Sequence, residues 1–218
     1  MSQQAVIFDV DGVLVDSYQP HFLSWQQMLA ELGEEFTEET FRSTFGRTNP
    51  DIFAQLFGEK YSTAEVKTHA DRKEAIYREI IKHDFPAIDG AVELIDALAG
   101  AGFALAVGSS GPPENVAQTL ASLGRAEVLT ARVTGADVTR GKPDPQVFLL
   151  AAAKLGIAPA DCVVVEDAPA GVAAAKNAEM ACIALTGTAS REELAQADLV
   201  VESLRELAAD LVANLLHR

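Results

Sequence analysis

Short apolar runs of strand length alternate with amphipathic stretches over most of the chain. The run at 162–165 is almost continuously apolar, which is expected of a parallel strand that is covered on both faces. Between the runs, apolar residues recur at helical spacing. Strands that alternate with helices predict an α/β fold with a doubly wound parallel sheet. The predicted strands lie at residues 6–8, 103–107, 128–129, 162–165, 180–185 and 199–201.

The segment from residue 17 to 85 differs, because it has helical periodicity and no strand signal. Ser62 and Glu65 form a capping box ahead of a helix that is expected to run to about residue 83. This helical block directly follows the first strand and so interrupts the sheet. We interpret residues 17–85 as an inserted helical cap domain, and we expect residues 1–16 and 86–218 to form one core domain.

A loop is expected inside the helical block, between two of its helices. The pattern predicts a short helix over residues 37–45 and a loop that contains Gly46, Arg47 and Thr48. Asn49 precedes Pro50, which is the arrangement of an N-cap residue followed by proline at the first helical position. Asn49 is therefore the predicted cap of the next helix.

Composition limits the classes of partner. The chain has 218 residues, 49% of them apolar, and a formal net charge of -15. That charge repels nucleic acid and anionic membranes, so neither is an expected partner. The N-terminus lacks the pattern of a signal peptide, and no stretch has the length of a membrane span. Cys162 and Cys182 lie in apolar runs and are expected to be reduced thiols in a cytoplasmic protein.

Candidate chemistry begins where the first predicted strand ends. Asp9 and Asp11 follow three apolar residues and are spaced two apart, so their side chains would point to the same side of the sheet. Two partly buried carboxylates on one side need a cation or a shared proton. Mg²⁺ suits oxygen ligands and can also hold a substrate phosphate. A turn in which the aspartates only cap the chain is the alternative that these residues leave open.

Other predicted strands also end in polar residues. Ser109 follows the second strand and Glu166-Asp167 the fourth, while Lys142 lies in a loop before a helix. Ligands of open α/β sheets bind beyond the carboxyl ends of the strands, so these residues are expected to meet in a phosphate site. Each has a structural alternative: Asp167 and Ser109 can be helix caps, and Lys142 can be a solvated loop residue. Their occurrence in one order along the chain favours the functional interpretation.

Together these segments resemble the four motifs of the haloacid dehalogenase (HAD) superfamily. The matching segments are residues 8–17 (FDVDGVLVDS), Ser109, residues 141–143 (GKP) and Glu166-Asp167. The helical block resembles the C1 cap of the β-phosphoglucomutase and phosphoglycolate phosphatase group within that superfamily. The resemblance spans nearly the whole chain and implies a Rossmann-like core with a cap.

The resemblance implies the following roles. Asp9 would be the nucleophile and a magnesium ligand. Asp11 would be the general acid/base and would give the metal its backbone carbonyl. An aspartate in that place fits phosphate esters, since it can protonate a leaving oxygen and then activate water.

The remaining motif residues would complete the site. Ser109, its neighbour Ser110 and Lys142 would hold the phosphoryl group. Asp167 would bind Mg²⁺ directly, and Glu166 would bind it directly or through water.

The cap would supply substrate contacts. His21 and Lys73 resemble residues of the β-phosphoglucomutase group that contact the substrate, and Arg47 and Thr48 lie in the expected cap loop. Each also has a structural alternative, such as a packed histidine or a charge on a solvated helix. The mutases carry an arginine, which grips a second phosphate, where this chain has Asn49.

We therefore expect a monomeric, magnesium-dependent phosphatase of small phosphorylated metabolites, most simply sugar phosphates. Two alternatives remain: a β-phosphoglucomutase-type phosphohexomutase, and a non-catalytic binding protein that keeps the fold. The complete set of nucleophile, acid/base, lysine and metal carboxylates argues against the latter.

Overall fold

The computed structural model describes residues 3–44 and 47–216. Its centre is a six-stranded sheet with the order β3-β2-β1-β4-β5-β6, in which each neighbouring pair is parallel. The strand order reverses at β1, so the carboxyl ends of β1, β2 and β4 lie side by side, where open α/β sheets bind ligands. The strands are β1 (Ala5–Phe8), β2 (Ala104–Gly108), β3 (Leu129–Val133), β4 (Cys162–Glu166), β5 (Ala181–Leu185) and β6 (Leu199–Val201).

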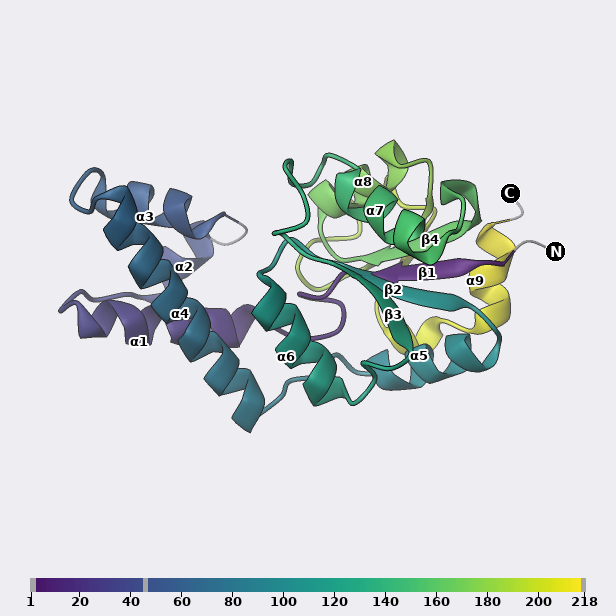
Figure 1. Cartoon of the computed structure of the whole chain (residues 1–218), viewed down its shortest axis with the longest axis horizontal. Helices are drawn as coiled ribbons and strands as arrows, with labels where there is room; N and C mark the ends of the chain where they lie inside the picture. The colour runs from purple at the N-terminus through teal and green to yellow at the C-terminus, as the bar shows by residue number, and fades with distance from the viewer. Residues whose placement is uncertain (1–2, 45–46, 217–218) are drawn as a thin grey trace. The chain divides into compact units, whose positions relative to one another are not determined.

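Helices cover both faces of this sheet (Figure 1). On one face α7 (Gln146–Leu155) packs against β1, β2 and β3, and α8 (Pro169–Asn177) packs against β4 and β5. On the other face α5 (Ala91–Gly100) packs against β2. Two further helices are α6 (Pro113–Leu123) and α9 (Ala209–Leu215). Because β1 and β4 are covered on both sides, all of their residues are buried. The prediction of a doubly wound parallel sheet is confirmed.

The chain divides into two compact units, one formed by residues 1–16 and 86–218 and the other by residues 17–85. Within the first unit, the two places where the chain enters and leaves the helical segment are hydrogen-bonded to each other. The Asp16 N–H donates to the Pro86 carbonyl at 2.8 Å. Val15 also forms an isolated antiparallel bridge with Ala87. The two ends of the insertion are therefore held together by backbone groups of the sheet-bearing unit.

The second unit is helical throughout its regular structure. It consists of α1 (Tyr18–Glu31), α2 (Glu38–Thr44), α3 (Asn49–Phe57) and α4 (Thr63–His83), with α1 packed along α4. Its core is rich in aromatic side chains, including Trp25, Phe36, Phe41 and Phe53. The capping box predicted at Ser62 and Glu65 is present at the start of α4.

The prediction that Asn49 caps the next helix is wrong. The N-cap of α3 is Thr48, whose hydroxyl accepts the N–H of Asp51. Asn49 is the first helical residue, and its side-chain amide donates instead to Glu74 Oε1 at 2.8 Å. The predicted helix over 37–45 has its described part in α2, while Phe45 and Gly46 lie outside the described residues.

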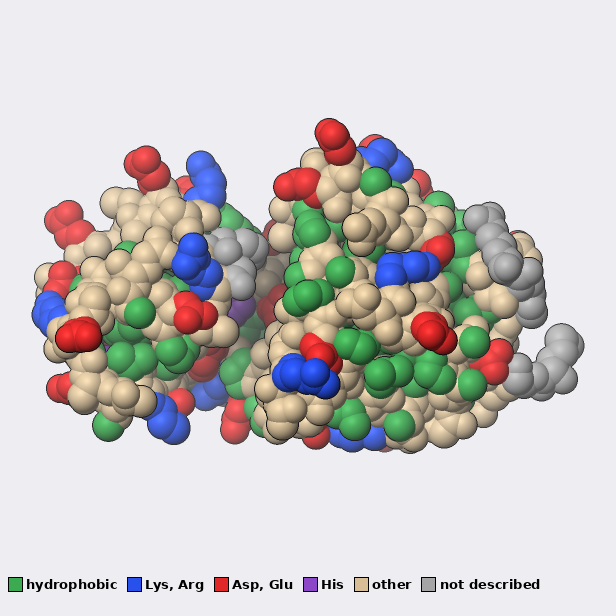
Figure 2. Space-filling view, turned by 90° about the horizontal axis from the view of Figure 1, so that it is seen from above, with side chains coloured by type: hydrophobic (Ala, Val, Ile, Leu, Met, Phe, Trp, Pro, Cys, Tyr) green, Lys and Arg blue, Asp and Glu red, His purple; other side chains and the backbone are tan. Residues whose placement is uncertain are grey.

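The surface carries charges of both signs. Figure 2 shows acidic and basic side chains dispersed over the face in view, with apolar side chains between them. Many described cations are paired with carboxylates, such as Arg72 with Glu31 and Arg125 with Asp96, both at 2.6 Å. Within residues 3–44 and 47–216, no helix combines the length and apolar character needed to cross a bilayer.

Candidate active site

Asp9 lies where β1 ends, at the centre of the sheet. Its N–H continues the ladder by donating to the Val165 carbonyl at 2.9 Å, and its side chain is buried. The chain then turns sharply through Gly12, whose φ of 76° is easily reached only without a side chain. The Gly12 N–H closes this turn on the Val15 carbonyl at 2.8 Å. The strand and the turn together fix Asp9 at the edge predicted for the site.

Lys142 reaches Asp9 from the loop that precedes α7. Its ammonium donates to Asp9 Oδ1 at 2.6 Å and to Glu166 Oε1 at 2.5 Å. All three side chains are largely buried, with 11%, 9% and 1% of their surface exposed. The alternative of a solvated loop lysine is therefore excluded, and the ends of β1 and β4 are joined through one cation.

Glu166 has hydrogen bonds on both carboxylate oxygens. Oε1 accepts from Lys142, while Oε2 accepts the backbone N–H groups of Asp167 and Ala168 at 2.8 and 2.9 Å. These two N–H groups lie at the start of α8, where backbone donors have no partner within the helix. The carboxylate therefore holds the lysine and stabilises the beginning of α8.

Two glycines make room for the carboxylates of Glu166 and Asp167. A Cβ on Gly171 would lie 1.7 Å from Glu166 Oε1, and a Cβ on Gly12 would lie 1.9 Å from Asp167 Oδ2. Thr188, after β5, lies close enough to Asp167 for its hydroxyl to lower the pKa of that carboxyl. Sequence reasoning assigned no role to Gly171 or Thr188. Gly171 did carry a signal, because a glycine inside a helical pattern lowers helix stability and usually has a packing reason.

Ser109 directly follows β2 at the same edge of the sheet. The side chain is 1% exposed, and Oγ accepts the Gly111 N–H at 2.9 Å. A Cβ on Gly111 would lie 3.2 Å from Ser109 Oγ and 3.6 Å from Asp11 Oδ2, so this glycine brings the hydroxyl and the carboxylate close to one backbone segment. Ser110 differs: it is exposed, and its hydroxyl makes no hydrogen bond with any described residue. The structure thus brings Ser109, but not Ser110, into the cluster.

Burial and mutual repulsion shape the electrostatics of the site. Burial raises the pKa of Asp9 well above its ordinary value; Lys142 opposes this shift, and the carboxylates of Glu166, Asp167 and Asp11 add to it. Burial, followed by the Glu166 carboxylate, raises the pKa of Asp167 to about 7. Burial would lower the pKa of Lys142, but Asp9 and Glu166 outweigh burial and raise it.

The donor set fits a divalent cation. Asp9, Glu166 and Asp167 each offer an oxygen, and these oxygens lie within 4.8 Å of one another. Three carboxylates face one ammonium in a buried place, and their mutual repulsion adds to the burial that raises the pKa values of Asp9 and Asp167. Magnesium prefers oxygen ligands and carries the charge that is missing here. The fourth predicted metal residue, Asp11, is not part of this group of oxygens, but its carboxylate lies close enough to help raise the pKa values of Asp9 and Asp167.

The four predicted cap residues belong to the helical unit, where only two of them meet. Lys73 Nζ lies 2.7 Å from His21 Nδ1, and Lys73 is 2% exposed. Thr48 serves as the α3 cap and donates to Asp51 Oδ2 at 2.6 Å. Arg47 is exposed and forms no ion pair with a described residue. The side-chain bond from Asn49 to Glu74 was not foreseen, since nothing in the local pattern signals a contact so distant in sequence.

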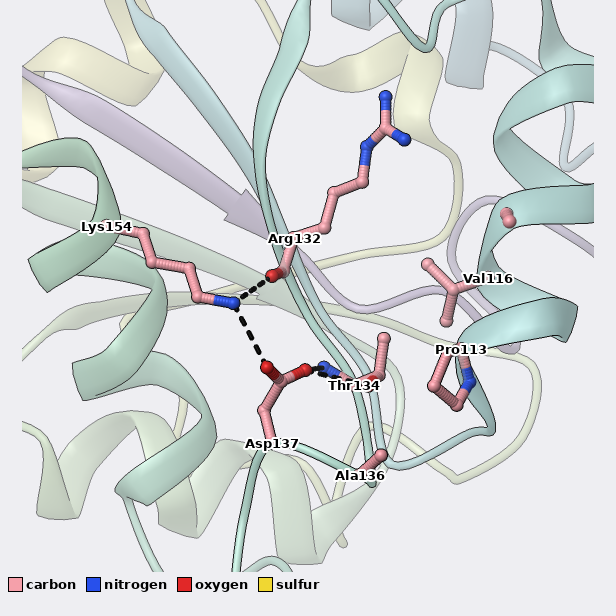
Figure 3. Close-up of a pocket in the computed structure, with 8 residues that line it drawn as sticks. Pro113, Val116, Arg132, Thr134, Ala136, Asp137 and Lys154 are labelled. Atoms are coloured by element: carbon pink, nitrogen blue, oxygen red, sulfur yellow. Dashed lines mark hydrogen bonds and ion pairs between the residues drawn. The ribbon is translucent and has the colours of Figure 1, made fainter.

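A pocket of about 380 Å³ elsewhere in the sheet-bearing unit contains none of the predicted site residues (Figure 3). It lies at the edge strand β3, between α6 and α7. Lys154 donates to the Arg132 carbonyl at 2.6 Å and to Asp137 Oδ1 at 3.2 Å, while Asp137 Oδ2 accepts the Thr134 N–H at 2.8 Å. The bond to the Arg132 carbonyl occupies one backbone acceptor of the edge strand, and the bond to the Thr134 N–H lies just after the end of that strand.

Comparison with known proteins identifies the family. The profile of the haloacid dehalogenase-like hydrolase family matches residues 6–185, and the chain belongs to this family of enzymes. It is 33% identical to validoxylamine A 7'-phosphate phosphatase of Streptomyces hygroscopicus subsp. limoneus, over 94% of this chain and 95% of that protein.

A mutase and a solved structure are also similar to this chain over nearly its whole length. β-Phosphoglucomutase of Bacillus subtilis (strain 168) is 32% identical over 98% of this chain and 94% of the mutase. The crystal structure of a HAD hydrolase, family IA, variant 3, from Entamoeba histolytica superposes with a TM-score of 0.88 at 25% identity, covering 99% of this chain and 100% of that one. The predicted membership of the superfamily is confirmed.

Replacing Gly171 tests how the Glu166 carboxylate is held. In a helix, alanine is ordinarily more stable than glycine by roughly 0.5–1 kcal/mol. In Gly171→Ala the new Cβ would displace Glu166 from Lys142 and from the start of α8, so we expect the free energy of unfolding to fall by about 1–3 kcal/mol. The matched control is Gly100→Ala in α5, where nothing lies within 4 Å. Urea denaturation of both variants checks the prediction, and equal stabilisation of both would contradict it.

Removing the Asp167 carboxylate tests the metal site through stability. Without metal, the folded protein keeps a proton on Asp167 up to about pH 7, whereas an unfolded chain releases it near the ordinary value of 3.8. The folded state therefore binds more protons in this window, and its stability falls as pH rises from about 4 to 7. Relative to Asp167→Asn, we expect the metal-free wild type to lose up to about 1.4 kcal/mol per pH unit there.

Magnesium should reverse this loss in the wild type but not in Asp167→Asn. At saturating Mg²⁺ the melting temperature of the wild type should rise, by an amount corresponding to about 2.7 kcal/mol at a hundredfold excess over Kd. Thermal denaturation with EDTA or Mg²⁺ between pH 4.5 and 7.5 provides the measurement, with Asp210→Asn, an exposed carboxylate in α9, as control. An equal magnesium shift in Asp167→Asn would argue against this site.

Proposed function

We propose that this protein is a magnesium-dependent phosphatase that hydrolyses phosphate monoesters of small sugar-like metabolites through an aspartyl phosphate on Asp9. The observation that carries the proposal is the cluster at the ends of β1, β2 and β4, in which Asp9 lies 2.6 Å from the Lys142 ammonium and shares a site with two further carboxylates. A single buried cation beside an acidic cluster suits the transfer of an anionic phosphoryl group.

The first step is attack by a carboxylate oxygen of Asp9 on phosphorus. As that bond forms, the bond from phosphorus to the ester oxygen breaks, and Asp11 gives its proton to the leaving alkoxide. The Ser109 hydroxyl and the Lys142 ammonium donate hydrogen bonds to the phosphoryl oxygens. In the second step Asp11 takes a proton from water, the water oxygen attacks phosphorus, and phosphate and Asp9 are released.

The metal would be held by Asp9, Asp167, Glu166 and the backbone carbonyl of Asp11. When bound, Mg²⁺ supplies positive charge that screens the carboxylates from the incoming phosphate. Because both Glu166 oxygens already accept hydrogen bonds, we infer that Glu166 contacts the metal through water or exchanges the Lys142 bond for it. Residues 17–85 would act as the cap that excludes bulk water and contacts the organic part of the substrate.

A phosphatase is favoured over a phosphohexomutase by the state of Asn49. Its amide donates to Glu74 within the helical unit, which directs the side chain at a carboxylate, and the side chain offers no positive charge for a second phosphate. The similarity to validoxylamine A 7'-phosphate phosphatase supports a phosphorylated, sugar-like substrate. The similarity to β-phosphoglucomutase and the exposed Arg47 make the mutase the alternative that an assay must test.

The products of one reaction distinguish these functions. With Mg²⁺ and a panel of phosphate monoesters that includes β-glucose 1-phosphate primed with its 1,6-bisphosphate, we expect release of inorganic phosphate. Free phosphate and glucose 6-phosphate are measured together. Glucose 6-phosphate without free phosphate would make the protein a mutase, and neither product from any ester would favour a non-catalytic role.

The nucleophile is tested by Asp9→Asn, which keeps the size of the side chain but removes the attacking oxygen charge. We expect phosphate release to fall by about 10³-fold or more, because the covalent step is lost. The control Asp210→Asn should retain full activity. Acid quenching of the wild type during turnover should also trap radioactive phosphate on the protein. A fully active Asp9→Asn would overturn the mechanism.

A further inference from the structure

A turn that follows β3, at residues 134–137, is hydrogen-bonded to the loop that carries Ser109. The Gly135 N–H donates to the Gly111 carbonyl at 2.9 Å. The Gly111 N–H donates in turn to Ser109 Oγ at 2.9 Å. The Ser109 N–H itself donates to the carbonyl of Val133, the last residue of β3, at 3.0 Å. Both the backbone and the hydroxyl of Ser109 are therefore tied to the end of β3 and the turn behind it.

The turn and the loop approach each other most closely at Gly135. A Cβ at this position would lie 2.4 Å from the Ser110 carbonyl oxygen and 3.3 Å from that of Gly111. The φ of Gly135 is not positive, so its backbone has a φ that alanine can also adopt. The space between the two segments, and not the shape of the turn, is therefore what requires a glycine here.

Asp137 holds the turn in shape. Its N–H donates to the Thr134 carbonyl at 3.0 Å, and its Oδ2 accepts both the N–H and the hydroxyl of Thr134 at 2.8 Å. Lys154 donates to Oδ1 of the same carboxylate at 3.2 Å (Figure 3). Thr134 is buried, whereas Asp137 is exposed, and an exposed ion pair contributes little to global stability. The main consequence of this carboxylate is therefore local, because it fixes the direction in which the Gly135 N–H points.

We propose that Gly135 and Asp137 are positioning residues that set the place of the Ser109 hydroxyl in the phosphate site. Asp137 fixes the turn, the turn directs the Gly135 N–H at the Gly111 carbonyl, and the Gly111 N–H holds Ser109 Oγ. A hydroxyl that accepts this bond can still donate its own proton. In the proposed phosphatase, on which this role rests, that proton is donated to a phosphoryl oxygen. A displacement of about 1 Å at such a contact can lower the rate about a hundredfold.

Gly135→Ala tests the close approach. The new Cβ would push the loop away at the Ser110 carbonyl, so we expect kcat/KM for the best phosphate ester to fall by about ten- to a hundredfold. The matched control is Gly100→Ala in α5, where nothing lies within 4 Å of the added Cβ, and it should keep full activity. Unchanged kcat/KM in Gly135→Ala would overturn the proposal.

A double-mutant cycle separates positioning from a general loss of structure. If Gly135 acts through the Ser109 hydroxyl, its replacement should matter little once that hydroxyl is gone. We expect the double variant Ser109→Ala, Gly135→Ala to have a kcat/KM within about twofold of Ser109→Ala alone. Independent effects would multiply instead, and a loss equal to the product of the two single losses would refute the positioning role.

Two substitutions of Asp137 test the support of the turn at an exposed position, where folding is less sensitive. Asp137→Ala removes the acceptor for Thr134 and should lower kcat/KM by about tenfold, whereas Asp137→Asn keeps one oxygen that can accept the Thr134 N–H and should restore most of the activity. The matched control is Asp96→Ala, which removes an exposed aspartate paired with Arg125 at 2.6 Å and should have no effect. Full activity in Asp137→Ala would exclude a positioning role for Asp137.

Hydrogen exchange measures the same contact without any substrate. NMR should find the amides of Gly111 and Gly135 protected in the wild type, and both should exchange at least about tenfold faster in Asp137→Ala, with the amides of β1 unchanged. If this pattern appears but the wild type hydrolyses no ester, the proposed function fails and the support of the Ser109 loop stands. If esters are hydrolysed and the exchange of both amides is unaltered, the positioning role is refuted while the proposed function stands.

Discussion

The Lys142 ammonium, shared by Asp9 and Glu166, is the interaction on which the arrangement of the site depends. It joins the ends of β1 and β4, the two strands at which the sheet order reverses, to the loop before α7. Burying charged groups is unfavourable unless they are paired, and removing one partner of a buried pair leaves the other charge uncompensated. The same ion pair that would serve the chemistry therefore also fixes the local structure, and the carboxylates around it form a group that could hold a metal ion.

The sheet and the order of the site residues could be predicted because both depend on short-range patterns. Apolar runs locate the strands, and parallel strands bring their carboxyl ends to one edge, so Asp9, Ser109 and Glu166 could be placed together without coordinates. Prediction from sequence was less exact where two adjacent residues have the same capability. Thr48 and Asn49 are both good capping residues, and the choice between them follows from the Asn49 bond to Glu74, which is distant in sequence.

Other features depend on space that a sequence does not display. Gly171 could have been noticed as an unfavourable helix residue. The sequence could not show that the Glu166 carboxylate fills the space that a side chain at Gly171 would take. The orientations of loops and helices determine that Ser110 is exposed. They also determine that the four predicted cap residues do not all meet at one place. His21 and Lys73 are in contact, although their spacing along the chain did not indicate it.

The helical segment is inserted between β1 and β2, and this has a consequence for the order in which the protein can form during synthesis. Residues 17–85 are contiguous and leave the ribosome as one block, which can pack its aromatic core at once. β1 emerges earlier, yet its partners are Ala104–Gly108 and Cys162–Glu166. The central strand is therefore made first but gains its second partner only after residue 166, so one of its two edges stays unpaired until most of the chain has been translated.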